Sequence, residues 1–306
     1  MVSVRVNLRP MTQTPRTAVI PVAGFGTRML PVTRTVPKML LPVGTVPLIH
    51  RAVKEAAEAG FEKIVLIVSP GVDFVGEYFN NKPLLEAALK ASGKSDVLDD
   101  QLAITDLAEI VSVEQHEAKG NGHAVLMARE EVGDEPFALI WPDELFWGNS
   151  TAIEQVLAVW RERPGIVVGV VEVPDHAIPL LGVISGEEIS NTVWNLTGMV
   201  EKPSLEEAPS NLALVGPYLL TPEVFDALEQ TPPGAGGEIQ ITDGIAARIG
   251  VDVAHACVLQ GSRIDTGNPA GMVAATIFES QQNPEAHALV EAVLEQARLG
   301  AKRSAD

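Results

Sequence analysis

The feature that most constrains the fold is an alternation of short apolar runs with helical segments in the first half of the chain. Residues 17–23 (TAVIPVA), 63–69 (KIVLIVS) and 136–141 (PFALIW) have the length and apolar character of buried strands. Residues 47–60 have helical spacing, with proline at the start and glycine at the end. This alternation predicts a parallel sheet with crossover helices on both faces and ligands at the carboxyl ends of its strands.

The rest of the chain extends this pattern. A strand is predicted at 109–114 and a helix at 122–132, whereas 82–107 is a weakly patterned helical excursion from the sheet. After residue 165 strands dominate, and we expect GIVVGVVEV, LLGVIS, WNLTGMVEK and LALVGPYLL to continue the sheet as mixed strands. Residues 269–299 are predicted to form two helices with a charged face, a surface suited to oligomer contacts.

The charge of the chain limits its partners. With 22 Lys and Arg against 40 Asp and Glu, the net charge is −18, which repels nucleic acid and anionic membrane surfaces. No apolar run reaches the ~18 residues that a transmembrane helix needs. We therefore expect neither a nucleic acid nor a membrane as a partner. A bound triphosphate would need a local cluster of Lys, Arg and backbone N–H groups, and a divalent cation.

The single cysteine, Cys257, lies in an apolar segment with strand character, VAHACVLQ. One cysteine cannot form an internal disulfide, and no metal-binding spacing surrounds it. We interpret Cys257 as a buried core thiol, which is typical of a cytoplasmic protein.

A glycine-rich loop follows the first predicted strand. It reads AGFGTRMLP from Ala23 and is followed by PKMLLP, which contains Lys38. Glycines at Gly24 and Gly26 let backbone N–H groups approach a phosphate without Cβ clashes. Arg28 and Lys38 add two fixed positive charges, which suits a triphosphate.

The loop also has other interpretations. A dinucleotide-binding fingerprint needs a third glycine where Met29 stands, and the Gly-Lys-Ser/Thr of a P-loop is absent. A plain βα turn with surface Arg and Lys side chains stays open on the loop alone, because short glycine motifs match by chance often.

Six sequence blocks carry a resemblance that this loop alone does not. They read VIPVAGFGTRMLP…PKMLLPV, AKGNGHAVLMA, VGDEPFALIWPDE, GMVEKPSLEEAPSNLALVGPYLL, TPPGAGGEIQITD and DTGNPAG. In this order the chain, from about Thr17 to Phe278, resembles bacterial UTP–glucose-1-phosphate uridylyltransferases, also called UDP-glucose pyrophosphorylases. The resemblance implies UTP and glucose 1-phosphate as substrates, UDP-glucose as product, and Mg²⁺ as cofactor.

The resemblance assigns nucleotide contacts residue by residue. Arg28 and Lys38 fall on the phosphates, and Gln115 and Gly122 fall where the family reads the uracil edge. The loop residues that cradle the nucleotide are Ala23, Gly24, Gly26 and Thr27. A side-chain amide offers both a donor and an acceptor, as a uracil edge requires, although Gln115 alone reads as a solvated residue at a strand end.

The resemblance also assigns the metal and the sugar contacts. Asp143 and Asp265 correspond to the two carboxylates that hold Mg²⁺, an ion that keeps most of its waters. An Asp after a strand, taken alone, is more often a helix cap. On the sugar side, Glu201 accepts hydrogen bonds from hydroxyls and Lys202 binds the sugar phosphate. The backbone at Gly182 and Gly216 lies against the sugar. Without the resemblance, the motif Glu201-Lys202-Pro203 would be interpreted as a solvated loop after a strand.

These assignments imply a mechanism. The sugar phosphate attacks the α-phosphorus in line and needs no general base, because it is already anionic. Catalysis then consists of positioning and of charge neutralisation by the cation and three cationic side chains, Arg28, Lys38 and Lys202.

Two positions depart from the family pattern. Met39 stands where the family has an acid beside the phosphate-binding Lys38, which puts nucleotide affinity or the metal environment in question, unless a neighbour compensates. Leu181 replaces a tyrosine before Gly182, and a lost hydroxyl can change sugar specificity.

Several functions remain open at this stage. The same reaction with another sugar or nucleotide, such as dTTP, is the nearest alternative. A catalytically weak homologue that senses nucleotide sugars is of a different class, but it would be free to lose Arg28, Lys38, Asp143, Lys202 or Asp265, all of which are present. A dehydrogenase is disfavoured by the missing glycine and by the lack of an acid after the second strand, which ends Val68-Ser69-Pro70.

The predicted domain organisation follows from these assignments. We expect an α/β fold with a Rossmann-like, mixed and mostly parallel sheet flanked by helices, in one nucleotidyltransferase domain at 17–282. Within it, 17–148 is the nucleotide-binding half and 149–268 the strand-rich sugar-binding half. Residues 1–16 are a disordered or extended leader, and 269–306 are C-terminal helices for a homodimer or homotetramer.

Overall fold

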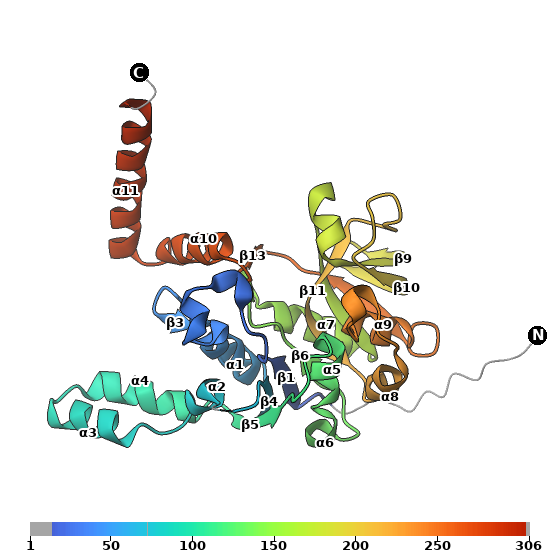
Figure 1. The fold of residues 1–306 in the computed structure, drawn as a ribbon, viewed down its shortest axis with the longest axis horizontal. Helices are drawn as coiled ribbons and strands as arrows, with labels where there is room; N and C mark the ends of the chain where they lie inside the picture. Colours follow the sequence, from blue (N-terminus) through green and yellow to red (C-terminus); the bar gives the residue numbers. More distant parts are fainter. Residues whose placement is uncertain (1–13, 72, 304–306) are drawn as a thin grey trace, which may run out of the picture.

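The computed structural model describes residues 14–71 and 73–303, which form one large mixed sheet with helices on both faces (Figure 1). The strand order is β5-β4-β1-β6-β11-β8-β12-β10-β9. These strands are β1 Thr17–Pro21, β4 Lys63–Val68, β5 Glu109–Glu114, β6 Phe137–Leu139, β8 Ile166–Glu172, β9 Gly182–Ser190, β10 Val193–Glu201, β11 Leu212–Leu220 and β12 Ala254–Val258. Two small antiparallel pairs join β2 Pro42–Val43 to β3 Val46–Pro47 and β7 Glu144–Trp147 to β13 Ser262–Asp265.

The first half of the sheet is parallel, as the alternation of strands and helices predicts. Strand β1 lies between β4 and β6 and pairs with both in parallel, and β5 continues the parallel order at the edge. Successive side chains of β1 enter opposite cores: Ala18 and Ile20 pack on one face and Val19 on the other. A strand buried on both faces must be apolar throughout, which is why this segment lacks polar alternation.

The second half of the sheet is mixed. Strand β11 pairs antiparallel with β6 and β8, and β10 pairs antiparallel with β12 and β9, whereas β8 and β12 run parallel. The mixed sheet is therefore confirmed, with its parallel order concentrated around β1. The predicted nucleotide and sugar halves meet where β6 and β11 pair.

Helices cover both faces of the sheet. Helix α1 Leu48–Glu58 and helix α7 Ala152–Glu162 pack on one face, whereas α5 Asn121–Leu126, α8 Glu223–Gln230 and α9 Ile241–Ala246 pack on the other. The helix predicted at 122–132 is divided into α5 and α6 Arg129–Val132. The prediction missed α7, although Thr151 and Glu154 form a capping box at its start. It also missed α8, α9 and the β7–β13 ribbon.

Two helical segments lie outside this layered body. The excursion expected at 82–107 consists of α3 Pro83–Ala91 and α4 Ser95–Thr105, which project from the β4–β5 edge after the short helix α2 Phe74–Glu77 (Figure 1). Toward the C-terminus of the chain, α10 Pro269–Ser280 lies against the body, and α11 Pro284–Arg303 extends away from it.

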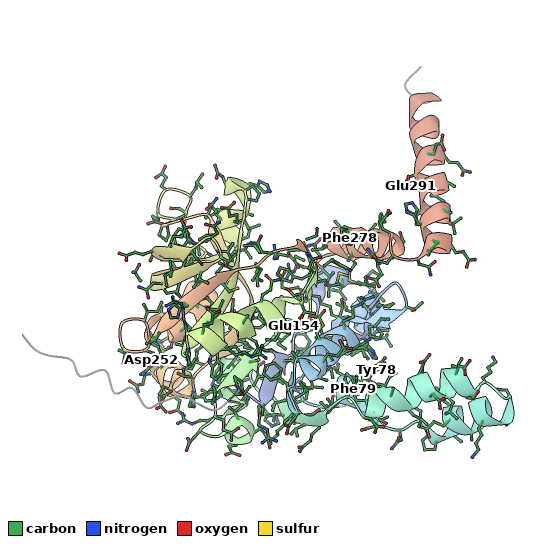
Figure 2. All side chains as sticks on the ribbon, turned by 180° about the vertical axis from the view of Figure 1, so that it is seen from behind. Tyr78, Phe79, Glu154, Asp252, Phe278 and Glu291 are labelled. Atoms are coloured by element: carbon green, nitrogen blue, oxygen red, sulfur yellow. The ribbon has the colours of Figure 1, made fainter. Side chains whose placement is uncertain are left out.

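Helix α10 is fixed to the body by aromatic and charged contacts. The rings of Trp147 and Phe278 lie 4.8 Å apart, and Trp147 Nε1 donates to Glu279 Oε2 at 3.1 Å. Arg51 on α1 forms an ion pair with Glu279 at 3.0 Å. Figure 2 shows Phe278 beside the body and Glu291 out on α11. Helix α10 is thus part of the globular unit, and α11 is the segment that leaves it.

The first described residues are joined to the sheet. Most of the leader predicted at 1–16 lies outside the described residues, but the carbonyl of Arg16 already accepts hydrogen bonds from the backbone N–H groups of Glu62 and Lys63.

Cys257 is a buried free thiol, as predicted, and burial raises its pKa to about 12. No helix within 14–71 and 73–303 is long and apolar enough to cross a membrane.

Candidate active site

The glycine-rich loop leaves β1 at the carboxyl edge of the sheet. Val22 N donates to the carbonyl of Ile67, and the Ser69 hydroxyl donates to the carbonyl of Ala23 at 2.5 Å, so β4 holds the start of the loop. At Gly24 a side chain would meet no atom within 4 Å. The loop therefore presents open backbone at Gly24, where a ligand can approach closely.

Gly26 has a different constraint. Its φ is +60°, a left-handed conformation that favours glycine, and a Cβ there would lie 3.0 Å from Cβ of Lys38. Gly26 immediately precedes the 3₁₀ turn Thr27–Met29, which carries Thr27 and Arg28, both exposed. The left-handed conformation of Gly26 thus turns the chain directly before Thr27 and Arg28.

Lys38 lies in the 3₁₀ turn Lys38–Leu40 and is only 8% exposed. Its Nζ is 2.5 Å from Oδ2 of Asp143, although the two residues are 105 positions apart. The buried ammonium group is therefore paired with one of the carboxylates that the sequence assigned to a metal. In this position Lys38 links the segment after the glycine loop to the end of β6.

The two predicted metal carboxylates are brought together by the β7–β13 ribbon. Asp265 pairs in register with Glu144, the residue after Asp143. Thr266 is fully buried, and both its backbone N–H and its hydroxyl donate to the carbonyl of Asp143 at 2.8 Å. This pairing explains how two aspartates far apart in sequence reach one place.

Charged groups surround this carboxylate pair. Gly267 N donates to Oδ1 of Asp265 at 2.6 Å, and a Cβ at Gly267 would lie 3.5 Å from Nη1 and Nη2 of Arg28. The guanidinium of Arg28 therefore sits over the turn that carries Asp265. Beneath the ribbon, Arg263 donates to both carboxylate oxygens of Glu144 at 2.6 Å, which locks the two strands together.

The donor set suits a hard divalent cation. Carboxylate oxygens are the protein ligands that Mg²⁺ and similar ions prefer, usually one or two per site together with phosphate and water. Across 14–71 and 73–303, no cluster of three or more His, Cys, Asp or Glu side chains could hold a metal by itself. Asp143 and Asp265 therefore fit a cation that a bound phosphate helps to coordinate, rather than a closed metal site.

Gln115 lies just past β5, where its backbone N–H donates to the carbonyl of Val68. Its Nε2 contacts the carbonyl of Gly120 at 3.2 Å and Nδ1 of His123 at 3.0 Å. Burial, followed by the charge of Lys119, lowers the pKa of His123. In the neutral tautomer with the proton on Nε2, Nδ1 accepts from the Gln115 amide. Sequence reasoning assigned no role to His123. In the structure His123 and Gly120 together fix the orientation of the Gln115 amide.

Gly122, the second residue of α5, is in close contact with another segment. Its N–H donates to the carbonyl of Ile239 at 2.9 Å, and a Cβ there would lie 2.9 Å from Ile239 O and from the Gln240 carbonyl carbon. Glycine is thus required for this packing, and the assignment of Gly122 to the base stays a prediction.

The predicted sugar residues meet at the end of β10. Glu201 pairs in register with Gly182 on β9, and Lys202 N donates to the carbonyl of Leu181. Lys202 has φ +49°, the only positive φ among the described non-glycine residues. Its Nζ lies 3.4 Å from Oε1 of Glu201 and is about half exposed. Glu201 and Lys202 therefore form one charged group open to ligand.

Gly216 lies on β11 against an aromatic side chain. Its φ is +75°, and a Cβ there would lie 2.6 Å from Cδ1 of Trp141. Trp141 immediately precedes the Pro142-Asp143 turn. Only glycine allows this approach, so Gly216 connects the sugar half to the strand end that carries Asp143.

The two departures from the family pattern have different surroundings. Met39 is 8% exposed and belongs to the core cluster that includes Val22, so its side chain packs in the interior. It does not add or remove charge at the loop surface. Leu181 is partly buried against a small cluster with Ile178 and Val183.

Three of the sequence blocks contain small polar side chains to which the sequence analysis assigned no role. In DTGNPAG, Thr266 holds Asp143, and in EIQITDG, Thr242 donates to Oε2 of Glu201 at 2.7 Å. Asn121, in AKGNGH, accepts from Ile241 N at 2.8 Å. Small polar residues inside glycine-containing motifs are a signal that could have identified Thr266, Thr242 and Asn121 as structural residues. The residues with which they form hydrogen bonds lie far away in sequence, so the sequence could not identify those partners.

Comparison with known proteins shows the family of the chain. Residues 17–282 match the family model described as nucleotidyl transferase. The UTP–glucose-1-phosphate uridylyltransferase of Staphylococcus epidermidis is 39% identical over 279 residues, which cover 91% of this chain and 97% of that protein. The protein of the same name from Staphylococcus haemolyticus is 40% identical over 269 residues, or 88% of this chain and 93% of that protein.

Solved structures give the same result. The UTP-bound UGPase from Acinetobacter baumannii has a TM-score of 0.85 at 33% identity, covering 92% of this chain and 99% of that one. A UDP-glucose pyrophosphorylase complexed with UDP-glucose has a TM-score of 0.80 at 34% identity, covering 88% and 100%. Because the family model and these relatives all span most of the chain, this protein belongs to the nucleotidyl transferase family.

Proposed function

We propose that this protein transfers a uridylyl group from UTP to glucose 1-phosphate, giving UDP-glucose and pyrophosphate. The observation that carries the proposal is the meeting of Lys38 and Arg28 with the two carboxylates, Asp143 and Asp265, beside the loop after β1. A phosphoryl-transfer site needs such a combination of fixed cations and metal-binding oxygens in a chain whose net charge is −18.

The choice of substrates is supported by the relatives. The curated proteins similar along about nine tenths of the chain are named UTP–glucose-1-phosphate uridylyltransferases. The similar solved structures include one bound to UTP and one complexed with UDP-glucose. On the nucleotide side we assign Gly24, Gly26 and Gln115, and on the sugar side Glu201 and Lys202.

The reaction requires little covalent chemistry from the protein. An oxygen of the sugar phosphate forms a bond to the α-phosphorus of UTP, the bond to the bridging oxygen breaks, and pyrophosphate leaves with that electron pair. No proton has to move, because the attacking oxygen is already anionic. Arg28 and Lys38 neutralise charge on the triphosphate, and Lys202 holds the sugar phosphate beside it.

We further propose that the cation is Mg²⁺, held by Asp143 and Asp265. When bound, a divalent cation neutralises charge on the reacting phosphate oxygens. Lys38, now 2.5 Å from Asp143, is placed to exchange part of that contact for a phosphate oxygen when nucleotide binds.

Pyrophosphate release is the measurement that tests the reaction. The protein is assayed with Mg²⁺ over a grid of UTP, dTTP, ATP, CTP and GTP against several sugar 1-phosphates, including those of glucose and galactose. We expect the strongest signal with UTP and glucose 1-phosphate, and loss of it on chelation with EDTA. Strong turnover elsewhere on the grid would reassign the substrates, and silence from folded protein would reject the enzyme.

Matched aspartate variants test the carboxylate assignment. Asp265→Asn should lower turnover by about 100-fold or more, since it removes a charge at the reacting phosphates. Asp226→Asn is the control, because Asp226 is exposed on α8 in an ion pair with Arg129. Equal activity of the two variants would contradict the assignment of Asp265.

We infer that the protein acts in the cytoplasm and associates with copies of itself through its C-terminal helices. A buried free thiol at Cys257 is compatible with a reducing compartment. On α11, Leu289 and Val293 lie one turn apart and are 68% and 55% exposed. Because helices in proteins are stabilised mainly by packing of an apolar face, exposed apolar side chains on a helix that leaves the body suit contact with a helix of a second subunit.

A further inference from the structure

The carboxylate of Glu201 is held more firmly than a residue at a strand end requires. Its side chain is 13% exposed, and Oε2 accepts a hydrogen bond from the hydroxyl of Thr242 at 2.7 Å. The other oxygen, Oε1, lies 3.4 Å from Nζ of Lys202. The hydroxyl of Thr242 therefore fixes Oε2, whereas Oε1 faces the ammonium group of the half-exposed Lys202 side chain.

Thr242 provides that hydroxyl from a fixed helix. It is 4% exposed and lies in α9, whose Ile241 and Ile245 belong to the core. Ile241 N donates to Oδ1 of Asn121 at 2.8 Å, and Gly244 packs so closely on Leu228 that a Cβ would lie 2.5 Å from its Cδ2. The hydroxyl therefore cannot follow Glu201 if the carboxylate moves.

The space around this hydrogen bond is closed from the opposite side. A Cβ at Gly182 would lie 2.9 Å from Oε2 of Glu201 and 3.3 Å from Oγ1 of Thr242. The adjacent carboxylate, Asp243, is directed elsewhere, since its Oδ2 would lie 2.6 Å from a Cβ at Gly234. Only the Thr242 hydroxyl is therefore donated to Glu201 from α9.

The same segment also supports the nucleotide side. Ile239 N donates to the carbonyl of Lys119 at 2.7 Å, and its own carbonyl accepts from Gly122 N. The chain from Ile239 to Thr242 thus connects the α5 loop, where Gln115 is bound, to the carboxylate at the end of β10. A hydroxyl on so constrained a segment fixes Glu201 in one rotamer.

We propose that Thr242 is a positioning residue that holds Glu201 with Oε1 directed at the sugar hydroxyls, and thereby sets discrimination among hexose 1-phosphates. This inference rests on the proposed function. A site that accepts a sugar hydroxyl from one fixed direction discriminates against an epimer whose hydroxyl points elsewhere. The epimer leaves a buried polar group of the site unpaired. Without the Thr242 hydroxyl, Glu201 can rotate and accept hydroxyls in more than one arrangement.

The test compares Thr242→Val, which removes the hydroxyl at nearly equal volume, with Thr242→Ser, which keeps it. For Thr242→Val we expect KM for glucose 1-phosphate to rise about tenfold, and the preference for glucose over galactose 1-phosphate to fall by a similar factor. The KM for UTP should stay within about twofold, and Thr242→Ser should restore both sugar readouts. A purely structural role would not divide the two KM values in this way.

The control is Thr221→Val. Thr221 is also buried, and within the described residues its hydroxyl has no hydrogen-bond partner, so its loss should leave all three readouts unchanged. If Thr242→Val does not fold, Thr242→Ala takes its place.

A double-variant cycle gives a second and independent measure. If Thr242 acts through Glu201, adding Thr242→Val to Glu201→Ala should change the sugar KM no further. Additive effects, or an unchanged sugar preference in the folded single variant, would overturn the inference. Wild-type protein that does not turn over UTP with glucose 1-phosphate would instead reject the proposed function, so the two failures are distinguishable.

Discussion

Gly24 and Gly26 belong to one loop, but a methyl group would meet different surroundings at each. At Gly26 the backbone is left-handed and Lys38 lies 3.0 Å from the added Cβ, whereas at Gly24 the space is open. Gly26→Ala should therefore destabilise the protein by about 1–3 kcal/mol, because it adds backbone strain and displaces Lys38. Urea unfolding measures this change in the free energy of unfolding.

Gly24→Ala is the matched control for that measurement. It should change the free energy of unfolding by less than about 1 kcal/mol, because nothing lies within 4 Å of the added group. It should nevertheless raise KM for UTP, since the methyl group occupies the space where the nucleotide is proposed to bind. Equal destabilisation by the two substitutions would show that the left-handed turn does not distinguish these glycines.

Lys202 combines a side chain proposed to bind the sugar phosphate with a strained backbone. A left-handed conformation costs a residue with a Cβ about 1–2 kcal/mol, and asparagine tolerates it better than alanine. Both Lys202→Ala and Lys202→Asn should lose sugar-phosphate binding, but Lys202→Asn should be the more stable by about 0.5–1 kcal/mol. Chemical denaturation with a parallel activity assay checks both. Equal stability of the variants would argue against strain at this position.

At the scale of elements, helix α1 contains a carboxylate that favours its neutral form. Burial raises the pKa of Glu55 to about 7, with Arg51 opposing the shift and the carboxylates of Glu58 and Glu154 adding to it. The folded state therefore binds a proton that the unfolded state releases near pH 4.5. The contribution of Glu55 to the free energy of unfolding is therefore fully present below pH 4.5. It is lost as the pH rises through 7 and stays absent at higher pH.

Replacement of Glu55 by glutamine should remove this pH dependence. Glu55→Gln should raise the free energy of unfolding at pH 8 by about 1–3 kcal/mol and leave it nearly unchanged at pH 4.5. Thermal or urea unfolding across that range gives the difference, with Glu130→Gln as control, because Glu130 is exposed on α6 and its charge does not act on Glu55. A gain of equal size at both pH values would mean that ionisation is not its cause.

The β7–β13 ribbon is the element that completes the site. It carries Asp265 to Asp143, and Thr266 fixes the pair with two hydrogen bonds to one carbonyl. Its strands are four residues each and lie outside the main sheet, so neither has the apolar length by which strands are recognised in a sequence. This explains why the ribbon was missed although both aspartates were singled out.

At the scale of the whole molecule, the body and α11 differ in how they are held. The body has two apolar cores, one on each face of the sheet, and α10 is fixed to it through Trp147 and Glu279. Helix α11 leaves this unit and exposes Leu289 and Val293. Its stability should therefore depend on a partner rather than on the fold of its own chain.

The double variant Leu289→Glu, Val293→Glu tests this dependence. It should lower the molar mass measured by light scattering, because charged groups cannot be buried between two apolar helix faces, while the thermal midpoint of the body changes little. Glu291→Lys changes a charge on the opposite, exposed face of the same helix and should leave the mass unchanged. An unchanged mass for the double variant would place the contact elsewhere.

Much of the fold was predictable because its signals are local. The continuous apolar runs of β1 and β4 predicted strands buried on both faces, and Pro47 predicted the start of α1 to within a residue. The mixed order of the second half was expected, but its pairing was not, since antiparallel and parallel neighbours present similar apolar runs. Which strands become neighbours depends on packing among distant segments.

Site residues divide in the same way. Arg28, Lys38, Asp143 and Asp265 stand in motifs that can be read along the chain, so the sequence by itself determined the family and predicted these residues as the site. The tertiary structure alone decided that Lys38 pairs with Asp143 and that Thr242 holds Glu201. Hydrogen bonds of this kind join groups 41 and 105 positions apart, and no local pattern encodes a contact that exists only after the sheet has assembled.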